Sequence, residues 1–259
     1  PTSAAGACLA LADRLDTLIG VWAAGMKPTG SKDPFALRRG ALGVVRILVD
    51  QGRDVSVADL LRSAAANYPQ LKDADATVTE AADFVRDRLA GYLTEEEGRP
   101  ADVVAAVVHA EGSGAGTNPL DARARAEALA ELREARREDF DALAAGFKRA
   151  KNILKKESGD SGAPDAALLQ EDAERALHQA FLDADERVVA AQRDQRYADA
   201  FAGLAGLRGP IDAFFDQVLV IAEDEAVRKN RLRLLGRIVD RIQGLADLSR
   251  LTVAEESRA

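Results

Sequence analysis

Apolar residues recur at helical spacing along most of this chain, and no stretch shows the alternation of apolar and polar residues that is typical of a strand. The clearest case is 120–157, where an apolar stripe with a period near 3.6 residues predicts one long helix or two consecutive helices. The residues of that stripe are Leu129, Leu132, Phe140, Leu143, Phe147, Ala150 and Leu154. A similar stripe predicts a helix over 166–196, and further helices are expected between 210 and 250. The pattern therefore predicts an all-α fold.

The composition supports this fold class and bounds the cellular setting. Aromatic residues make up only 5% of the 259 residues, which favours helix over sheet. The single cysteine, Cys8, excludes an internal disulfide framework and fits a reducing, cytoplasmic location. No apolar run approaches the roughly 20 residues of a membrane span. Because the first residue is Pro1 and not methionine, we expect an excised C-terminal piece of a longer protein, with N-terminal processing as the alternative.

The chain is long enough for two ordinary domains, and the glycine-rich segment EGSGAGTNP at 111–119 is the best internal boundary. We expect a helical bundle over 1–110, a flexible linker at 111–119 and a second bundle over 120–259. A phosphate-binding loop is the alternative for this segment. It is disfavoured because no strand precedes the glycines and no Lys-Ser/Thr pair follows them.

Two segments are basic although the chain carries a net charge of −8. Residues 148–156 contain five basic residues and no acidic residue, and residues 227–250 contain seven basic and two acidic residues. The overall charge argues against nucleic-acid binding over the whole surface. The two basic segments make a local site for a polyanion plausible.

A turn and a helix start are predicted at 28–39. Pro28, Gly30 and Pro34 cannot lie inside a helix, so the sequence PTGSKDP predicts an ordered loop. We expect Asp33 to accept hydrogen bonds from the first turn of the next helix and Pro34 to be its first residue.

Several motifs resemble the β subunit of the bacterial heterotetrameric glycyl-tRNA synthetases. The segments ADRLDTL at 12–18 and PTGSKDPFALRR at 28–39 are similar to an ADKLDTL segment followed by PTGSKDPFALRR in that family. Further similar segments are FVRDRLAGYL at 84–93, ADVVAAVV at 101–108, FKRAKNIL at 147–154 and EDEAVRKNRLRLL at 223–235. The resemblance covers essentially the whole chain, as the C-terminal part of that subunit.

The resemblance implies the end of an HD-type helical domain followed by a DALR-like anticodon-binding domain. It implies a part of a glycine–tRNA ligase, with glycine tRNA and the synthetase α subunit as partners in an α2β2 assembly. ATP and Mg²⁺ are expected on the α subunit, and no cofactor on this chain. We expect no catalytic residue here, and neither a membrane nor DNA as a partner. The rival interpretations are an HD-type hydrolase and a helical scaffold that holds subunits together without binding RNA.

Asp13 matches the position of the last metal-binding aspartate of HD-type domains. Such a site also needs a histidine and an adjacent His-Asp pair, but His109 and His178 are followed by Ala110 and Gln179. We therefore expect no metal site, and Asp13 is better interpreted as a local capping or pairing residue.

The candidate RNA-binding residues come from the two basic segments, because cations bind phosphates and an amide can pair with a base edge. They are Lys148, Arg149, Lys151, Asn152, Arg228, Lys229 and Arg231. The alternative for the first segment is that basic residues complement the C-terminal dipole of their helix, which fits Lys155 and Lys156. Asn152 is equally consistent with a cap of a neighbouring helix, and Arg231 with a structural partner of Asp216. A solvated face is preferred for Arg38 and Arg39 over contact with the acceptor arm of the tRNA.

Overall fold

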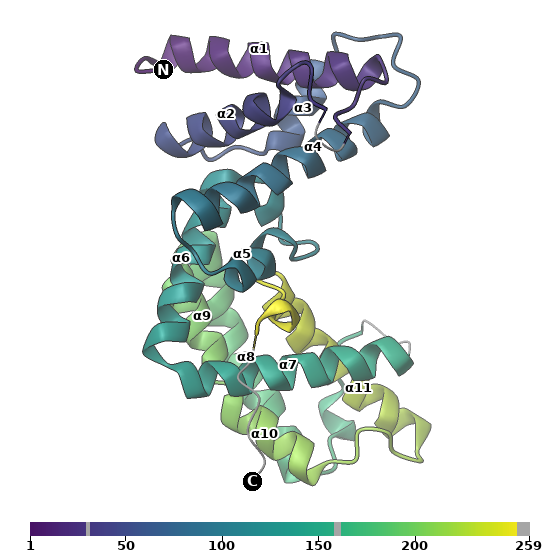
Figure 1. Ribbon diagram of the computed structural model, residues 1–259. Helices are drawn as coiled ribbons and strands as arrows, with labels where there is room; N and C mark the ends of the chain where they lie inside the picture. Colours follow the sequence, from purple (N-terminus) through teal and green to yellow (C-terminus); the bar gives the residue numbers. More distant parts are fainter. Residues whose placement is uncertain (30–31, 158–161, 253–259) are drawn as a thin grey trace. The chain divides into compact units, whose positions relative to one another are not determined.

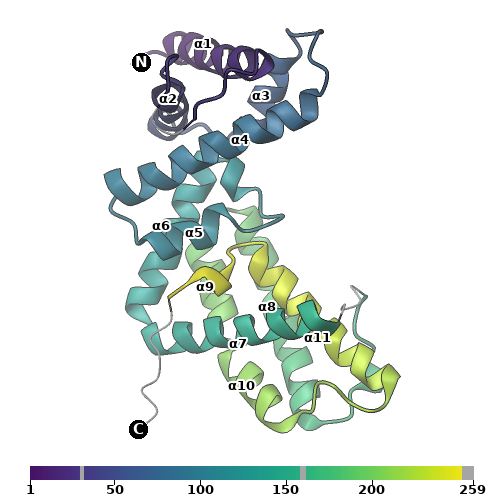
Figure 2. The same cartoon turned by 45° about the vertical axis from the view of Figure 1, so that its right-hand side comes forward.

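The computed structural model describes residues 1–29, 32–157 and 162–252, and Figures 1 and 2 show its helices from two sides. Within these ranges no strand is formed, and the one β-type pairing is an isolated bridge between Thr29 and Lys32. The predicted all-α fold is confirmed. The chain divides into two compact units: Pro1–His109 with Gly114–Ala124, and Ala110–Ser113 with the chain from Arg125 onward.

The first unit is built on four helices. They are α1 (Ala4–Ala23), α2 (Leu37–Asp50), α3 (Val57–Ala65) and α4 (Ala74–Gly91). Helix α1 packs on α2 and α3, and α4 packs on both of these (Figure 1). Fully buried side chains such as Leu18, Leu48 and Leu61 fill the space between them. A π-helical turn, η1 (Tyr92–Glu96), and the short α5 (Ala101–Val108) follow α4.

The predicted linker at 111–119 contains a folded turn. Residues Ala115–Thr117 form the 3-10 helix η2, which packs against α4 and α5. Ala115 is completely buried. Gly116 lies so close to the carbonyl oxygen of Val108 that a β-carbon at this position would overlap it. The part of the segment from Gly114 is thus integrated into the first unit, although the domain boundaries at 110 and 120 stay a prediction.

The start of α2 differs in part from the prediction. Asp33 accepts hydrogen bonds from the backbone N–H groups of Leu37, at 2.8 Å, and Arg38, at 3.0 Å, as a capping residue does. Pro34 is not the first helical residue, because α2 begins at Leu37. The chain first passes through Ala36, whose φ of 54° is left-handed. Gly30, also assigned to this loop, lies outside the described residues.

Replacing Asp33 with alanine is expected to lower the free energy of unfolding by about 1 kcal/mol, because two N–H groups of α2 lose their partner. Chemical denaturation of both proteins measures the difference. Asp50→Ala, an exposed aspartate at the other end of α2, is the matched control and should change stability less. An unchanged unfolding midpoint for Asp33→Ala would show that the cap contributes nothing.

The second unit contains helix α6 (Pro119–Ala135) from Arg125 onward and the helices that follow it, which are labelled in Figure 2. Helix α6 is followed by α7 (Arg137–Glu157), α8 (Asp172–Arg193), α9 (Tyr197–Ala205), α10 (Arg208–Gln217) and α11 (Glu225–Gln243). The two consecutive helices predicted as one option for 120–157 are thus α6 and α7. Helix α7 packs on α10 and α11, and α8 packs on α9 and α10. Phe140, Phe147 and Phe214 are among its most deeply buried side chains.

The helix predicted for 166–196 is shorter than expected. Residues Ala166–Leu168 form a separate 3-10 turn, η3, and α8 begins only at Asp172. Glu171 and Glu174 form a reciprocal capping box that fixes this start. Residues 158–161, between α7 and η3, lie outside the described residues. None of the helices in the described ranges is long and apolar enough to cross a membrane.

Candidate nucleic-acid interface

Helix α7 has one buried and one exposed side, as its apolar period requires. Phe140, Leu143, Phe147 and Ala150 are buried on the side that packs on α10 and α11. With 3.6 residues per turn, the residues half a turn away point to solvent. We call the set Lys148, Arg149, Asn152 and Lys156 the basic face of α7, and all four of these side chains are exposed. The apolar stripe therefore determines that these residues form one surface.

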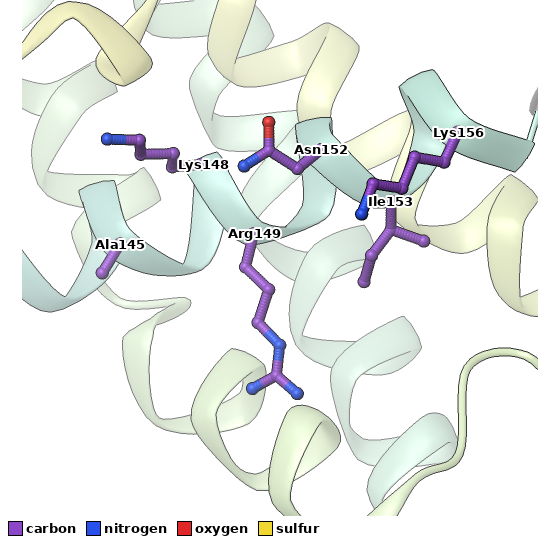
Figure 3. Close-up of a pocket in the computed structure, with 6 residues that line it drawn as sticks. All are labelled: Ala145, Lys148, Arg149, Asn152, Ile153 and Lys156. Atoms are coloured by element: carbon purple, nitrogen blue, oxygen red, sulfur yellow. The ribbon is translucent and has the colours of Figure 1, made fainter.

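The basic face of α7 lines a shallow hollow of about 410 Å³, completed by Ala145 and Ile153 (Figure 3). Arg149 extends away from Lys148 and Asn152 in this view. Neither Lys148 nor Lys156 forms an ion pair within the ranges that the structure describes. Two cations are therefore available to an anionic ligand, and an amide that can both donate and accept hydrogen bonds lies between them.

Arg149 makes a different contact from the two lysines. Its guanidinium carbon lies 4.3 Å from the centre of the Phe215 ring on α10. Gly146, one turn before it on α7, allows α10 to approach this closely, because a β-carbon there would lie 2.7 Å from Cγ2 of Ile211. Cation–π contact of this kind fixes a guanidinium in position. Arg149 is therefore held on α10 at the edge of the hollow.

Lys151 is not on the basic face. Its ammonium group donates to both carboxylate oxygens of Asp247 at 2.9 Å, and the Asp247 side chain is only 8% exposed. Burial raises the pKa of this carboxyl group, but hydrogen bonds from Ser249 and Lys151 outweigh it and lower the pKa below its usual range. This ion pair joins α7 to the segment around η4 (Leu248–Arg250), and the Lys151 side chain is 34% exposed. The call of Lys151 as an RNA-binding residue stays a prediction.

Arg231 is a buried structural residue, which corrects its place among the RNA-binding candidates. Its side chain is 6% exposed, and its ion-pair partner, Glu174 of α8, is 0% exposed. The partner considered from the sequence, Asp216, is exposed at the end of α10. Arg231 also donates to the carbonyl oxygen of Leu219 at 2.7 Å. The residue therefore holds α11, α8 and the segment after α10 together.

Arg228 and Lys229 lie at the start of α11 and do not line the hollow. Arg228 donates to the carbonyl oxygen of Ala222 at 3.3 Å. Lys229 pairs with Glu225 at 2.6 Å on an exposed helix face, where such a pair is worth little. They are therefore not part of the hollow lined by Lys148 and Arg149. Their role in binding stays a prediction.

Two residues of the site were missed from the sequence. Lys156 was assigned to the helix dipole, although its spacing of four and eight residues from Asn152 and Lys148 places it on the same face. Phe215 was not among the candidate residues. No spacing rule connects it to Arg149, because they lie on different helices.

The described residues of the first unit contain no cluster of side chains around Asp13 that could bind a metal ion. Asp13 lies on the exposed side of α1 and lines a hollow of about 390 Å³ with Arg14, Phe35 and Arg39. In the part of the chain that the structure describes, no three side chains of histidine, cysteine, aspartate or glutamate converge as metal ligands would. The lining of this hollow thus places two arginines and no second acidic residue with Asp13.

The second unit, with its basic helix, has the sequence of an anticodon-binding domain. Residues 143–248 match the family model described as "DALR anticodon binding domain", and residues 1–109 match the one described as "Glycyl-tRNA synthetase beta subunit". The resemblance inferred from the motifs, including the DALR-like nature of the second bundle, is thereby confirmed.

The chain is similar over 97% of its length to curated glycine–tRNA ligase beta subunits. It is 43% identical over 252 residues to that of Chromohalobacter salexigens, and 42% identical over 252 residues to that of Ralstonia nicotianae. It is 40% identical over 251 residues to that of Neisseria gonorrhoeae. The chain spans 36%, 35% and 35% of the lengths of these three relatives, respectively.

Proposed function

We propose that this chain is a tRNA-binding part of a glycyl-tRNA synthetase β subunit, and that the basic face of α7 contacts the anticodon stem-loop of glycine tRNA. The observation that carries the proposal is the position of this face. Its residues, Lys148 to Lys156, lie inside the segment that matches the anticodon-binding model, and they line a hollow with two unpaired lysines among the described residues.

Electrostatics support this assignment. In a chain of net charge −8, exposed cations without acidic partners are attracted to a polyanion while the remaining surface repels it. Lys148 and Lys156 are two turns apart, about 12 Å along the helix axis. This distance lets them contact different phosphates of one RNA loop. Asn152 lies between them and is placed to reach a base edge.

The rest of the assembly belongs to the same proposal, of which the names of the relatives support only the glycine–tRNA ligase and its division into subunits. Glycine, ATP and Mg²⁺ are bound by a partner α subunit in an α2β2 enzyme, in the cytoplasm, and this chain positions the tRNA for that chemistry. It contributes no catalytic group and binds no cofactor itself. The competing function is a helical scaffold without RNA affinity.

Replacing both Lys148 and Lys156 with alanine is expected to weaken binding of glycine tRNA and to flatten its salt dependence. Each lost phosphate contact lowers the slope of log affinity against log salt by about 0.7–0.9 units, so the double variant should lose roughly 1.5 units. The measurement is a binding titration across a salt series with glycine tRNA and with the same tRNA carrying another anticodon. Helicity and melting temperature should stay near those of the original chain, because both side chains are exposed.

The matched control removes the same charge from another exposed surface, with Arg187→Ala and Arg193→Ala on α8. It should leave the salt slope nearly unchanged. Equal affinities and equal slopes for the lysine variant and the original chain would remove the RNA assignment and leave the scaffold. If the lysine variant and the arginine variant lose the same amount of affinity, the RNA is attracted by overall charge and not by the basic face of α7.

A further inference from the structure

Arg149 differs from its basic neighbours in a way that bears on what it recognises. Lys148 and Lys156 are compact, flexible point charges, whereas the guanidinium of Arg149 is flat and lies over the Phe215 ring at 4.3 Å. A phosphate contact needs a cation and hydrogen-bond donors, but no aromatic ring behind them. The aromatic support under Arg149 therefore adds something that phosphate binding does not require.

The packing of α7 on α10 fixes the position of this support. Gly146 lies against Ile211, and Arg149, one turn later, lies against Phe215, one turn after Ile211. Phe215 itself is 9% exposed and makes an edge contact with Phe214, with ring centres 5.6 Å apart. The ring thus belongs to the rigid core of the second unit. It holds Arg149 in one orientation and so lowers the entropy that binding would cost.

The groups around Arg149 match the parts of one unpaired nucleotide. The guanidinium carbon lies over the ring, and the Arg149 side chain as a whole is exposed and lines the hollow. Nucleobases stack on arginine planes as they do on aromatic rings. The same hollow is lined by the apolar side chains of Ala145 and Ile153, by the amide of Asn152 and by Lys148 and Lys156, although Arg149 extends away from Lys148 and Asn152 (Figure 3).

We propose that Arg149, supported by Phe215, is the stacking platform for one unpaired base of the RNA loop. This proposal rests on the function proposed above. It assigns the recognition of one unstacked RNA base to Arg149 and Phe215. It separates Arg149 from Lys148 and Lys156, which contact phosphates. A base-stacking role depends on the presence of one particular base in the RNA loop, and a phosphate-binding role does not.

The test uses Arg149→Lys, which keeps the charge and removes the plane. The ligands are the anticodon stem-loop of glycine tRNA and a series of the same RNA with one abasic nucleotide at each loop position. We expect one abasic position to weaken binding to the original chain by roughly 5- to 100-fold, the measured range for one stacked base. Arg149→Lys should weaken binding to the intact RNA by a similar factor with an unchanged salt slope. At that one abasic position, the substitution should cause no further loss.

Two further variants make the result specific. Phe215→Leu removes the support and should reproduce the effect of Arg149→Lys, with folding checked by circular dichroism. Lys148→Ala should lower the salt slope, and removal of the stacked base from the RNA should weaken its binding as much as it does for the original chain. The stacking role is overturned if Arg149→Lys binds every RNA as tightly as the original chain does. It is also overturned if the substitution lowers the affinity by the same factor for every abasic RNA. If the original chain binds no RNA at all, the proposed function itself fails.

Discussion

Replacing Arg231 with methionine is expected to lower the free energy of unfolding of the second unit by about 3–5 kcal/mol, the usual cost of breaking a buried ion pair from one side. Glu174 is fully buried, and one of its oxygens accepts from Arg231. The second oxygen accepts from the backbone N–H groups of Gln170, at 2.6 Å, and Glu171, at 2.8 Å. Without Arg231, a buried carboxylate retains these bonds but loses its counter-charge.

Urea denaturation of the variant and the original chain measures this loss. Arg237→Met on the same helix is the matched control, because Arg237 is exposed, and it should change stability by less than about 1 kcal/mol. Adding Glu174→Gln to Arg231→Met should restore part of the stability, since the unpaired charge is removed. Similar losses for Arg231→Met and Arg237→Met would show that the buried pair has no special contribution.

The same pair predicts a dependence on pH. Burial raises the pKa of Glu174, but the hydrogen bond from Arg231, the two backbone hydrogen bonds and the positive charge together bring it below its usual value. A carboxyl group whose pKa is lowered in the folded state stabilises the fold at pH values above the pKa of the unfolded state, which is about 4.3 for glutamate. That contribution is lost as the pH falls through the lower, folded value. The stability difference between the original chain and Arg231→Met should therefore narrow below about pH 4.

Replacing Gly116 with alanine is expected to destabilise the first unit by about 1–3 kcal/mol or more, as overpacking does. The added β-carbon would overlap the carbonyl oxygen of Val108 and lie 2.8 Å from Cδ of Arg86. The arginine side chain can move, but the backbone oxygen belongs to the last turn of α5 and cannot move without shifting that helix. The cost is therefore one of steric exclusion and not of backbone conformation, since φ of Gly116 is not in the left-handed region.

Gly91→Ala at the end of α4 is the matched control, because no atom lies within 4 Å of the added carbon and its φ is −60°. It should be neutral or stabilise by up to about 1 kcal/mol. Thermal unfolding of both variants gives the comparison. If Gly116→Ala is as stable as the original chain, then this segment is the flexible linker that its composition predicts. A clear loss of stability would show that the turn is part of the folded unit.

The sequence by itself determined the features that depend on local spacing. The apolar stripe of α7 follows from residues 3 and 4 apart, and the same spacing places Lys148 and Asn152 on its exposed face. The capping role of Asp33 also follows from near neighbours in the chain, although the intervening turn moved the helix start to Leu37. The long motifs at 12–18 and 28–39 were distinctive enough to indicate the family.

Only the tertiary structure decided which partner each charged or aromatic side chain meets. Arg231 pairs with Glu174, 57 positions away, and Lys151 pairs with Asp247, 96 positions away, so the partner of each lies on a distant segment of the chain. Phe215 on α10 lies under Arg149 on α7 because the two helices pack together. Helical spacing fixes the side of a helix on which a residue lies, but its neighbour on the next helix depends on how the two helices pack. That packing is set by contacts such as the one between Gly146 and Ile211, which no local pattern contains.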